Sequence, residues 1–497
     1  GLVCIYDPHR NSDKINALLK RMCQVMTHEP WYKTHTYVSA PIGLGRISLG
    51  IINPQPQPIH NEDASMTIFM QGEISAYERE PLKRKLLERG HSLQTGSDPE
   101  LLLHSFEDEG PGQLHTIDGT FVAIVWDHKR RGLTVLNDRH GLWPIYYYHK
   151  GDKLILGTEI KAVLQDHTVN RVVNIKAVND FFTFRHVLED ETVFEGIMIL
   201  PPASVLTFQD GTLSLQEHPI LELTEEFADK PISEYAHELA RLFRRAVNRQ
   251  LIGDFEIGSF LSGGLDSRCI AMMVGREHYP FKAFTRGAAG GYDHRFAQMV
   301  TSRLGIDHHF FEYGPDTLRF LAPKGVWLTE GMMTCIDFYA LHELDSIRQL
   351  VQVILDGIVG GPILGDAFKP DMIGTTDEEE LARKLYERSR AFMPDSFRAF
   401  LYSKTLYGQL KDEAFNALRR VLKAKIPPGS GSNRADYYGH RYIWPRTSYY
   451  GAMLIRHKIE VRFPFFDNAF FDFVYTIPPE MRVARRIEIE LLRTVRP

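Results

Sequence analysis

The chain has 497 residues, of which 43% are hydrophobic and 24% charged, and its formal net charge is −5. This composition is typical of a soluble globular protein, and its charge gives no reason to expect a nucleic-acid partner, which needs clustered Lys and Arg. No stretch approaches the roughly 18 uninterrupted apolar residues of a membrane span, so no membrane partner is expected. The length predicts two or three domains, and we expect two.

Cysteine and histidine usage bears on redox state and metal binding. The four cysteines form neither a disulfide framework nor a CxxC metal motif, and no leader is visible, so a reducing cytoplasm is the expected location. None of the 21 histidines, including the pair His308–His309, stands in an HExxH or similar frame. We therefore interpret the histidines as scattered surface and core residues.

Residues 1 to about 218 show the pattern of antiparallel hairpins. Apolar or alternating runs, such as MTIFMQGEI (66–74) and SVLTFQDGTLSLQE (204–217), are separated by short turn signals. Apolar residues spaced three and four apart predict helices at 13–26 and 99–110. The first half should be an antiparallel sheet structure with a few covering helices.

The pattern changes near residues 221–233, an acidic stretch that contains a proline. We place the boundary there, which gives domains at 1–218 and 233–497. A clear amphipathic helix is predicted at 233–251, and apolar runs beginning with FEIGSFL (255–261) then alternate with helical segments. This alternation indicates βαβ units and a parallel sheet.

A later segment, IPPGSGSNRADYY (426–438), is rich in glycine, proline and serine. Such a composition predicts a mobile loop.

The strand predicted at 255–261 ends in a glycine-rich turn, SGGLDS (262–267), and a helix should follow it. Glycines let backbone N–H groups approach a ligand, and a helix N-terminus adds unpaired donors, so the turn suits a phosphate or pyrophosphate. Asp266 would repel a bare phosphate but would help to hold a Mg²⁺ ion carried on the phosphates. A capped strand-to-helix turn, with glycine for tight packing, is an equal alternative from the spacing alone.

SGGLDS resembles the loop of the adenylating domains of the asparagine synthetase family. AFTRG (283–287) is similar to the family's second strand, whose end receives adenine, and EVRFPFFDN (460–468) resembles a segment near the family's C-terminus. The resemblance implies an ATP and pyrophosphate site made of residues from the first two of these segments and one glycine of a later segment, LDGIVGGPILGD (355–366): Ser262, Gly263, Gly264, Leu265, Asp266, Ser267, Phe284, Thr285 and Gly357. It also implies catalytic roles for Asp266, Glu460 and Arg462. For Glu460 and Arg462, a buried ion pair is an equally good structural explanation.

The first half resembles the glutaminase domain of the same family. GRISL (45–49), QGEIS (71–75) and TGSDPELLLH (95–104) match its glutamine-binding segments in order. The resemblance implies that Arg46 grips the substrate carboxylate and that Asp98 binds its amine, with Gln71, Gly72 and Glu73 as further remnants of a glutamine site.

The likeness extends over nearly the whole chain. It implies an α+β Ntn-hydrolase-like antiparallel sandwich (αββα) followed by an α/β parallel-sheet domain of the adenine-nucleotide α-hydrolase (PP-loop) type.

The glutaminase half departs from the family pattern in two places. The family uses an N-terminal cysteine followed by glycine, and this sequence begins at Gly1; Cys4, inside a predicted strand, lacks the free amine that serves as base. Gln71 stands where the family has the oxyanion-hole asparagine, and its longer side chain would displace the amide donor. We therefore expect a degenerate glutaminase domain. A cysteine directly before Gly1 would instead favour a glutamine-dependent asparagine synthetase.

The synthetase half also departs from the pattern. In LDGIVGGPILGD (355–366), the family has an acidic residue that helps to bind Mg²⁺ after the paired glycines. This chain has Gly361 and Pro362 there instead. Asp356 or Asp366 would supply the missing carboxylate, and we assign the metal site to Asp266 and Asp366.

The family's catalytic lysine falls near Ile489 in RRIEIELLR (485–493). Arg485, Arg486 and Arg493 are the candidates to neutralise the leaving pyrophosphate in its place.

The resemblance implies that ATP and Mg²⁺ activate a small-molecule or peptide carboxylate as an acyl-adenylate, which an amine then attacks. Without glutamine hydrolysis the chain would resemble β-lactam synthetases and lasso-peptide cyclases. A nucleotide-binding pseudoenzyme is the third hypothesis, and a homodimer stays open. An acceptor pocket is expected near Glu330 and Arg446.

Overall fold

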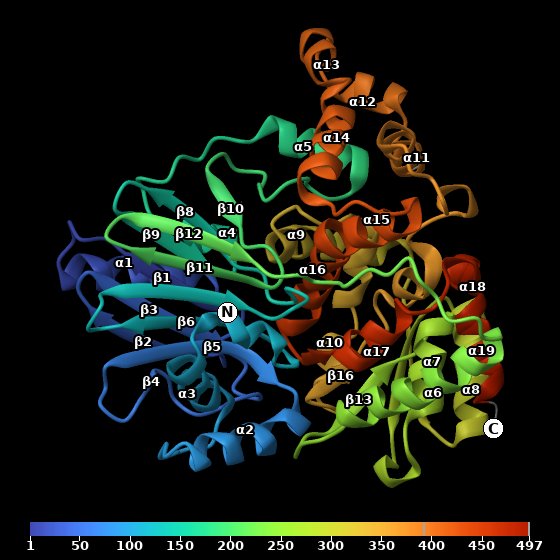
Figure 1. Cartoon of the computed structure of the whole chain (residues 1–497), viewed down its shortest axis with the longest axis horizontal. Helices are drawn as coiled ribbons and strands as arrows, with labels where there is room; N and C mark the ends of the chain where they lie inside the picture. Colours follow the sequence, from blue (N-terminus) through green and yellow to red (C-terminus); the bar gives the residue numbers. More distant parts are fainter. Residues whose placement is uncertain (391–392, 496–497) are drawn as a thin grey trace. The chain divides into compact units, whose positions relative to one another are not determined.

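The computed structural model describes residues 1–390 and 393–495, in which the chain forms two compact units. The first unit comprises Gly1–Ala177 and Asp190–Ile220, and the second comprises Val178–Glu189 and Leu221–Pro497. Figure 1 labels many of their helices and strands. Among the described residues, no helix has both the length and the apolar character that crossing a membrane requires.

The first unit contains two six-stranded antiparallel sheets, as the hairpin pattern predicted. In spatial order, the first sheet consists of β10 (Ile197–Ile199), β8 (Tyr146–Lys150), β9 (Lys153–Gly157), β1 (Leu2–Tyr6), β3 (Ile42–Ser48) and β2 (Lys33–Ser39). The second consists of β12 (Thr212–Glu217), β11 (Ser204–Gln209), β7 (Gly132–Asn137), β6 (Gly119–Asp127), β5 (Met66–Ile74) and β4 (Ile59–His60). The helices are α1 (Ser12–Val25), α2 (Ala76–Glu88), α3 (Asp98–Glu109) and α4 (Ile160–Val163), and α5 (Ile175–Phe184) continues into the second unit.

Successive residues of β5 face opposite sides of its sheet, because side chains alternate along a strand. Phe69 lies in the core between the two sheets, where Tyr6 and Phe208 pack with ring centroids 5.1 Å apart. Ile68, the residue before Phe69, faces the other side of the sheet and belongs to a second core that includes Leu102 of α3. Two sheets packed face to face, with helices outside, confirm the predicted αββα sandwich.

The second unit is built on a five-stranded sheet in which every pair is parallel, as the alternating pattern predicted. Its spatial order is β15 (Asp307–Glu312), β14 (Lys282–Gly287), β13 (Ile257–Phe260), β16 (Val353–Leu355) and β17 (Glu460–Arg462). Helices that follow or precede these strands are α6 (Ile232–Arg249), α7 (Leu265–Met273), α8 (Tyr292–Leu304), α9 (Pro315–Thr329), α10 (Leu344–Ile347), α16 (Trp444–Arg456), α17 (Asn468–Val474), α18 (Pro479–Arg482) and α19 (Arg486–Thr494).

A group of helices lies between β16 and β17 in the sequence: α11 (Glu378–Arg390), α12 (Asp395–Leu401), α13 (Lys404–Leu410), α14 (Glu413–Lys425) and α15 (Gly431–Tyr438). The mobile loop predicted at 426–438 is therefore wrong for its second half. Ser430 caps α15 by accepting a hydrogen bond from the backbone of Asn433, and the fully buried Asp436 pairs with Arg482 at 2.8 Å. The Ser and Gly that suggested a loop provide the start of a buried helix.

Candidate active site

The parallel sheet has a topological switch point at β13. The next two strands in sequence, β14 and β15, lie on one side of β13, whereas β16 and β17 lie on the other. Open α/β sheets bind ligands outside the carboxyl ends of the strands at such a point. The turn Ser262–Ser267 follows β13, and the segment Asp356–Gly361 follows β16, so both predicted loops meet at this edge.

Hydrogen bonds within the Ser262–Ser267 turn hold its shape. The backbone N–H of Ser262 donates to Ser267 Oγ at 3.0 Å, and that of Gly264 donates to Ser262 Oγ at 3.1 Å. The backbone N–H of Gly263 donates to Asp293 Oδ1 at 2.7 Å. A Cβ at Gly263 would lie 2.4 Å from the Tyr292 ring, so only glycine fits there without a shift. Asp293 was missed in the sequence because it lies on α8, far along the chain.

A cavity of about 580 Å³ opens beside this turn. Its lining includes the following predicted residues: Ser262, Asp266, Ser267, Phe284 and Gly357. Arg286 and Asp356 also line it. The cavity lies within the size range of small-molecule sites and joins a helix N-terminus to an aromatic ring, a combination that fits a nucleotide.

The predicted residue Thr285 supports the cavity through a backbone contact, and Gly360, which was not predicted, supports it through packing. Thr285 is buried, and its hydroxyl donates to the carbonyl of Leu261 at 2.7 Å, which fixes β14 against the turn. A Cβ at Gly360 would lie 2.4 Å from Asp266 Oδ1. The glycines after β16 therefore permit a close approach to the Asp266 carboxylate.

Asp266 belongs to a cluster of carboxylates around Arg485. Arg485 Nη2 lies 2.5 Å from Asp266 Oδ1, while its Nε lies 2.5 Å from Glu488 Oε2 and 3.7 Å from Asp366 Oδ2. Burial raises the pKa of Asp266, and burial together with the neighbouring Asp266 charge raises the pKa of Glu488 to about 8. At neutral pH, Glu488 thus holds a proton that it shares with Asp266.

With Glu488 protonated, the carboxylates of Asp266 and Asp366 and the single guanidinium of Arg485 still leave an excess of negative charge, which fits a divalent cation such as Mg²⁺. Asp266 and Asp366 are the acidic groups of this cluster nearest to water, with side chains 27% and 46% exposed, whereas that of Glu488 is fully buried. Asp356, the alternative ligand, accepts a hydrogen bond from the backbone of Ile358 at 2.9 Å, and burial raises its pKa.

The residues of α19 point in different directions. Ile489 is 40% exposed and lines a separate hollow with Arg268 and Met299, so the position where the family has a lysine faces away from the carboxylates. Arg486 donates to the carbonyl of Glu480, and Arg493 pairs with Glu490. Of the three candidate arginines, Arg485 is the one that the structure brings to Asp266.

Glu460 and Arg462 lie on β17, next to β16. Both are buried. Arg462 Nη1 donates to the carbonyls of Gln250 and Ile252 at 2.6 and 3.0 Å, and its guanidinium lies over Phe255 at 5.4 Å. These contacts connect Arg462 to the segment after α6 and favour its structural role.

A second cavity, of about 380 Å³, lies beside the first and shares Met333 and Asp337 with it. Its lining is rich in aromatic and apolar side chains, among them Phe184, Met332, Tyr438, Trp444 and Tyr450. Arg446 and Asp366 also line this cavity.

Arg446 thus lies where an acceptor pocket was expected, whereas Glu330 ends α9 in a left-handed conformation with φ 57°. Within the lining, His186 accepts a hydrogen bond from the Tyr438 hydroxyl at 3.0 Å on Nε2 and donates to the carbonyl of Phe184 at 2.9 Å from Nδ1. Burial lowers the pKa of His186 to about 3, so this histidine is neutral.

The predicted glutamine-site residues of the first unit lie together and contact one another. Arg46, which is fully buried, donates to Gln71 Oε1 at 3.3 Å and to the carbonyls of Ile52 and Asn53. Asp98 accepts bonds from Arg79, Asn53 and the backbone of Ile74 at 2.7 to 3.0 Å.

Gly72 and Glu73 complete this group: Gly72 has φ 95°, its carbonyl accepts from Asn53, and Glu73 pairs with Arg79 at 3.4 Å. Arg46 and Asp98, the two side chains that the resemblance assigns to glutamine binding, therefore already form hydrogen bonds with other residues of the protein. Cys4 is fully buried within β1, and burial raises the pKa of its thiol far above the ordinary value, which makes it a poor nucleophile.

Two family models match the chain. One, described as a glutamine amidotransferase domain, matches residues 1–219, and the other, described as asparagine synthase, matches residues 238–496. Asparagine synthetase [glutamine-hydrolyzing] 3 of Bacillus subtilis is 27% identical over 88% of this chain and 74% of its own length. Asparagine synthetase [glutamine-hydrolyzing] 1 of the same organism is 24% identical over 99% of this chain and 83% of its own. Amidase chry2 of Gibberella zeae is 23% identical over 91% of this chain and 76% of its own.

Proposed function

The chain belongs to the asparagine synthase family as an asparagine synthetase-like ATP-dependent ligase, and on that premise we propose that it joins a carboxylate to an amine through an acyl-adenylate. One observation carries this proposal: the Ser262–Ser267 turn, at the switch point of a parallel sheet, borders a cavity that adjoins a second cavity of different chemistry. Two adjoining cavities suit a reaction in which a nucleotide phosphate meets a separate carboxylate.

In this proposal the 580 Å³ cavity binds ATP and the 380 Å³ cavity binds the carboxylate substrate. A carboxylate oxygen attacks the α-phosphorus and pyrophosphate leaves; the amine then attacks the acyl carbon, loses a proton and displaces AMP. The chain's own contribution is to neutralise the polyphosphate charge. Ser262 and Ser267, at the two ends of the turn, would donate hydrogen bonds from their hydroxyls to phosphate oxygens. Asp266 and Asp366 would hold Mg²⁺, which supplies charge neutralisation when bound.

Arg485 is the protein cation of this site. Its guanidinium joins Asp266 to Glu488 in the structure, so it orients the carboxylate that would hold the metal. Because Ile489 replaces the family's lysine and faces elsewhere, we assign to Arg485 the neutralisation of pyrophosphate as it leaves.

The second cavity supports a carboxylate substrate with a large apolar or aromatic body. Phe184, Tyr438, Trp444 and Tyr450 give this cavity an extended aromatic surface, and charged side chains line it as well, among them Arg185, Asp366, Arg388 and Arg446. Asparagine synthetases take the small acidic substrate aspartate, as the resemblance implies, whereas the aromatic part of this lining favours an acid with a larger apolar body.

The occupied contacts of Arg46 and Asp98 support a first unit that does not hydrolyse glutamine. The attacking nitrogen would then come from a free amine, ammonia or the substrate itself. A glutamine-dependent asparagine synthetase is the alternative, and it requires a cysteine immediately before Gly1.

An exchange of radiolabelled pyrophosphate into ATP tests the proposal, with a panel of carboxylates that includes aspartate and larger apolar acids. We expect exchange that depends on an apolar acid, and its loss in Asp266→Asn. Exchange with aspartate, accompanied by glutamate release from glutamine in the full-length protein, would favour the alternative. Nucleotide binding with no exchange for any acid or peptide would favour a pseudoenzyme.

A further inference from the structure

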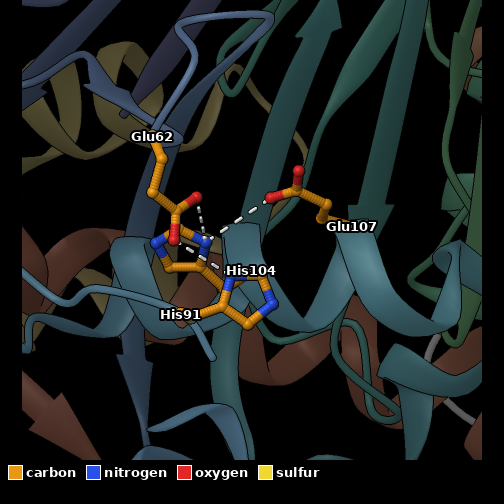
Figure 2. A group of neighbouring side chains, drawn as sticks. All are labelled: Glu62, His91, His104 and Glu107. Carbon is orange, nitrogen blue, oxygen red and sulfur yellow. Dashed lines mark hydrogen bonds and ion pairs between the residues drawn. The ribbon is translucent and has the colours of Figure 1, made fainter. Parts of the chain in front are cut away.

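Four side chains that could bind a metal meet in the first unit, apart from the residues discussed so far: Glu62, His91, His104 and Glu107 (Figure 2). Glu62 lies in the turn between β4 and β5, and His91 follows α2. His104 and Glu107 lie one turn apart on α3, so they share a face of that helix. Three separate segments therefore converge on one point.

The ligand atoms already lie near the spacing of a tetrahedral metal site. His104 Nδ1 lies 3.5 Å from Glu62 Oε2 and 3.5 Å from Glu107 Oε2, and His91 Nδ1 lies 3.1 Å from Glu62 Oε1. All four ligand atoms lie within 4.8 Å of one another. Ligands about 2.0–2.1 Å from a tetrahedral zinc ion are separated by about 3.4 Å, so only small side-chain movements are needed.

His104 provides an independent sign that the cluster takes a ligand. The residue is 1% exposed, and its Nδ1 is a buried atom that makes no hydrogen bond within the described structure. Both nearby carboxylates stand beyond good hydrogen-bonding distance from this nitrogen. A cation between this buried nitrogen and the two carboxylate oxygens would satisfy all three atoms, with Nδ1 as the unprotonated nitrogen of the ring.

Outer contacts fix the orientation of the ligands. His91 Nε2 lies 3.1 Å from Asp108 Oδ1, the carboxylate contact that commonly orients a metal-bound imidazole. Asn61 donates to Glu107 Oε1 at 3.0 Å, and the backbone of Ser92 donates to Glu62 Oε1 at 3.0 Å. In each glutamate the other oxygen, Oε2, is thereby directed toward His104.

We propose that Glu62, His91, His104 and Glu107 form a tetrahedral site for a divalent transition-metal ion, with zinc as the preferred ion. Two imidazole and two carboxylate ligands suit zinc, whereas calcium and magnesium prefer oxygen ligands alone. The side chains of Glu62 and Glu107 are 40% and 32% exposed, which leaves a path by which the ion enters. The ion would tie α3 to the turn before β5 and to the chain after α2.

The test is titration of the chelator-treated full chain with zinc chloride alone, followed by calorimetry and by metal analysis after dialysis. We expect one zinc ion per chain and a higher melting temperature with zinc. Cobalt(II) should give the visible absorption of a tetrahedral site, a readout that a merely structural histidine would not produce.

Glu107→Gln removes one ligand charge on a partly exposed residue while preserving an acceptor for Asn61, so the variant should fold. We expect zinc affinity to fall by at least about tenfold in this variant and in His104→Gln. His9→Gln is the matched control, because His9 also pairs with a carboxylate, at 2.9 Å from Asp152, but lies on the surface. Zinc binding that is absent, or that is equal in the parent and Glu107→Gln, would overturn the proposal in favour of a His104 that only packs beside the two carboxylates.

Discussion

Glu488→Gln should change how stability depends on pH. Burial first, and then the charge of Asp266, raises the Glu488 pKa from an ordinary 4.5 to about 8. A group whose pKa is raised in the folded state contributes stability that is fully present below the unfolded value and is lost as pH rises through the folded value. Stability linked to Glu488 should therefore decline from about pH 4.5 to about pH 8.

The magnitude follows from the same two values. At about 1.4 kcal/mol per pH unit, the interval between them corresponds to at most roughly 5 kcal/mol, which belongs to Glu488 and Asp266 together because the two carboxylates titrate as a pair. Because the Glu488 side chain is fully buried, solvent does not screen this contribution. Glutamine keeps an acceptor for Arg485 Nε but cannot ionise, so the variant should lose none of this stability.

Differential scanning calorimetry at several pH values measures the effect, and a shift with an ATP analogue identifies the transition of the second unit. We expect Glu488→Gln and the parent to melt at similar temperatures near pH 5, with the variant increasingly more stable toward pH 9. Glu490→Gln is the control, because Glu490 lies on the same helix and pairs with Arg493 at the surface. Parallel pH profiles of Glu488→Gln and parent would refute the assignment of the proton to Glu488.

Three further predictions concern the second unit. Asp266→Asn should weaken binding of a non-hydrolysable ATP analogue more with Mg²⁺ than without it, whereas equal losses in calorimetric titrations would argue against a metal ligand. Asp436→Ala should lower the free energy of unfolding by about 3–5 kcal/mol, because it leaves the Arg482 charge buried without this carboxylate. Asp436→Leu combined with Arg482→Met should recover much of the lost melting temperature. Tyr438→Phe removes the hydroxyl that forms a hydrogen bond with His186, so it should raise the KM for the carboxylate in pyrophosphate exchange and leave ATP affinity unchanged. A weaker ATP affinity would contradict the assignment of ATP and the carboxylate to separate cavities.

The sequence predicted well those features that depend on local pattern. Alternating runs such as 66–74 became strands of the sandwich, and the glycine pair before Asp266 became the turn at the switch point. Such features are encoded in residues that are neighbours in the chain.

Contacts between distant segments could not be obtained in this way. Asp293 reaches Gly263 from α8, and Arg485 reaches Asp266 from a segment near the end of the chain. The predicted loop at 426–438 failed for the same reason, since its helix is stabilised by burial and by a partner, Arg482, that lies far along the sequence. The histidines looked scattered because His91 and His104 meet only after α2 and α3 fold.

The isotope pattern of the products tests the adenylate most directly. A carboxylate labelled with heavy oxygen, chosen as the acid that supports pyrophosphate exchange, is incubated with the protein, ATP, Mg²⁺ and an amine, and the nucleotide product is analysed by mass spectrometry. Attack of the carboxylate on the α-phosphorus predicts AMP that carries one labelled oxygen. Formation of ADP with the label in inorganic phosphate, or AMP without label, would contradict it.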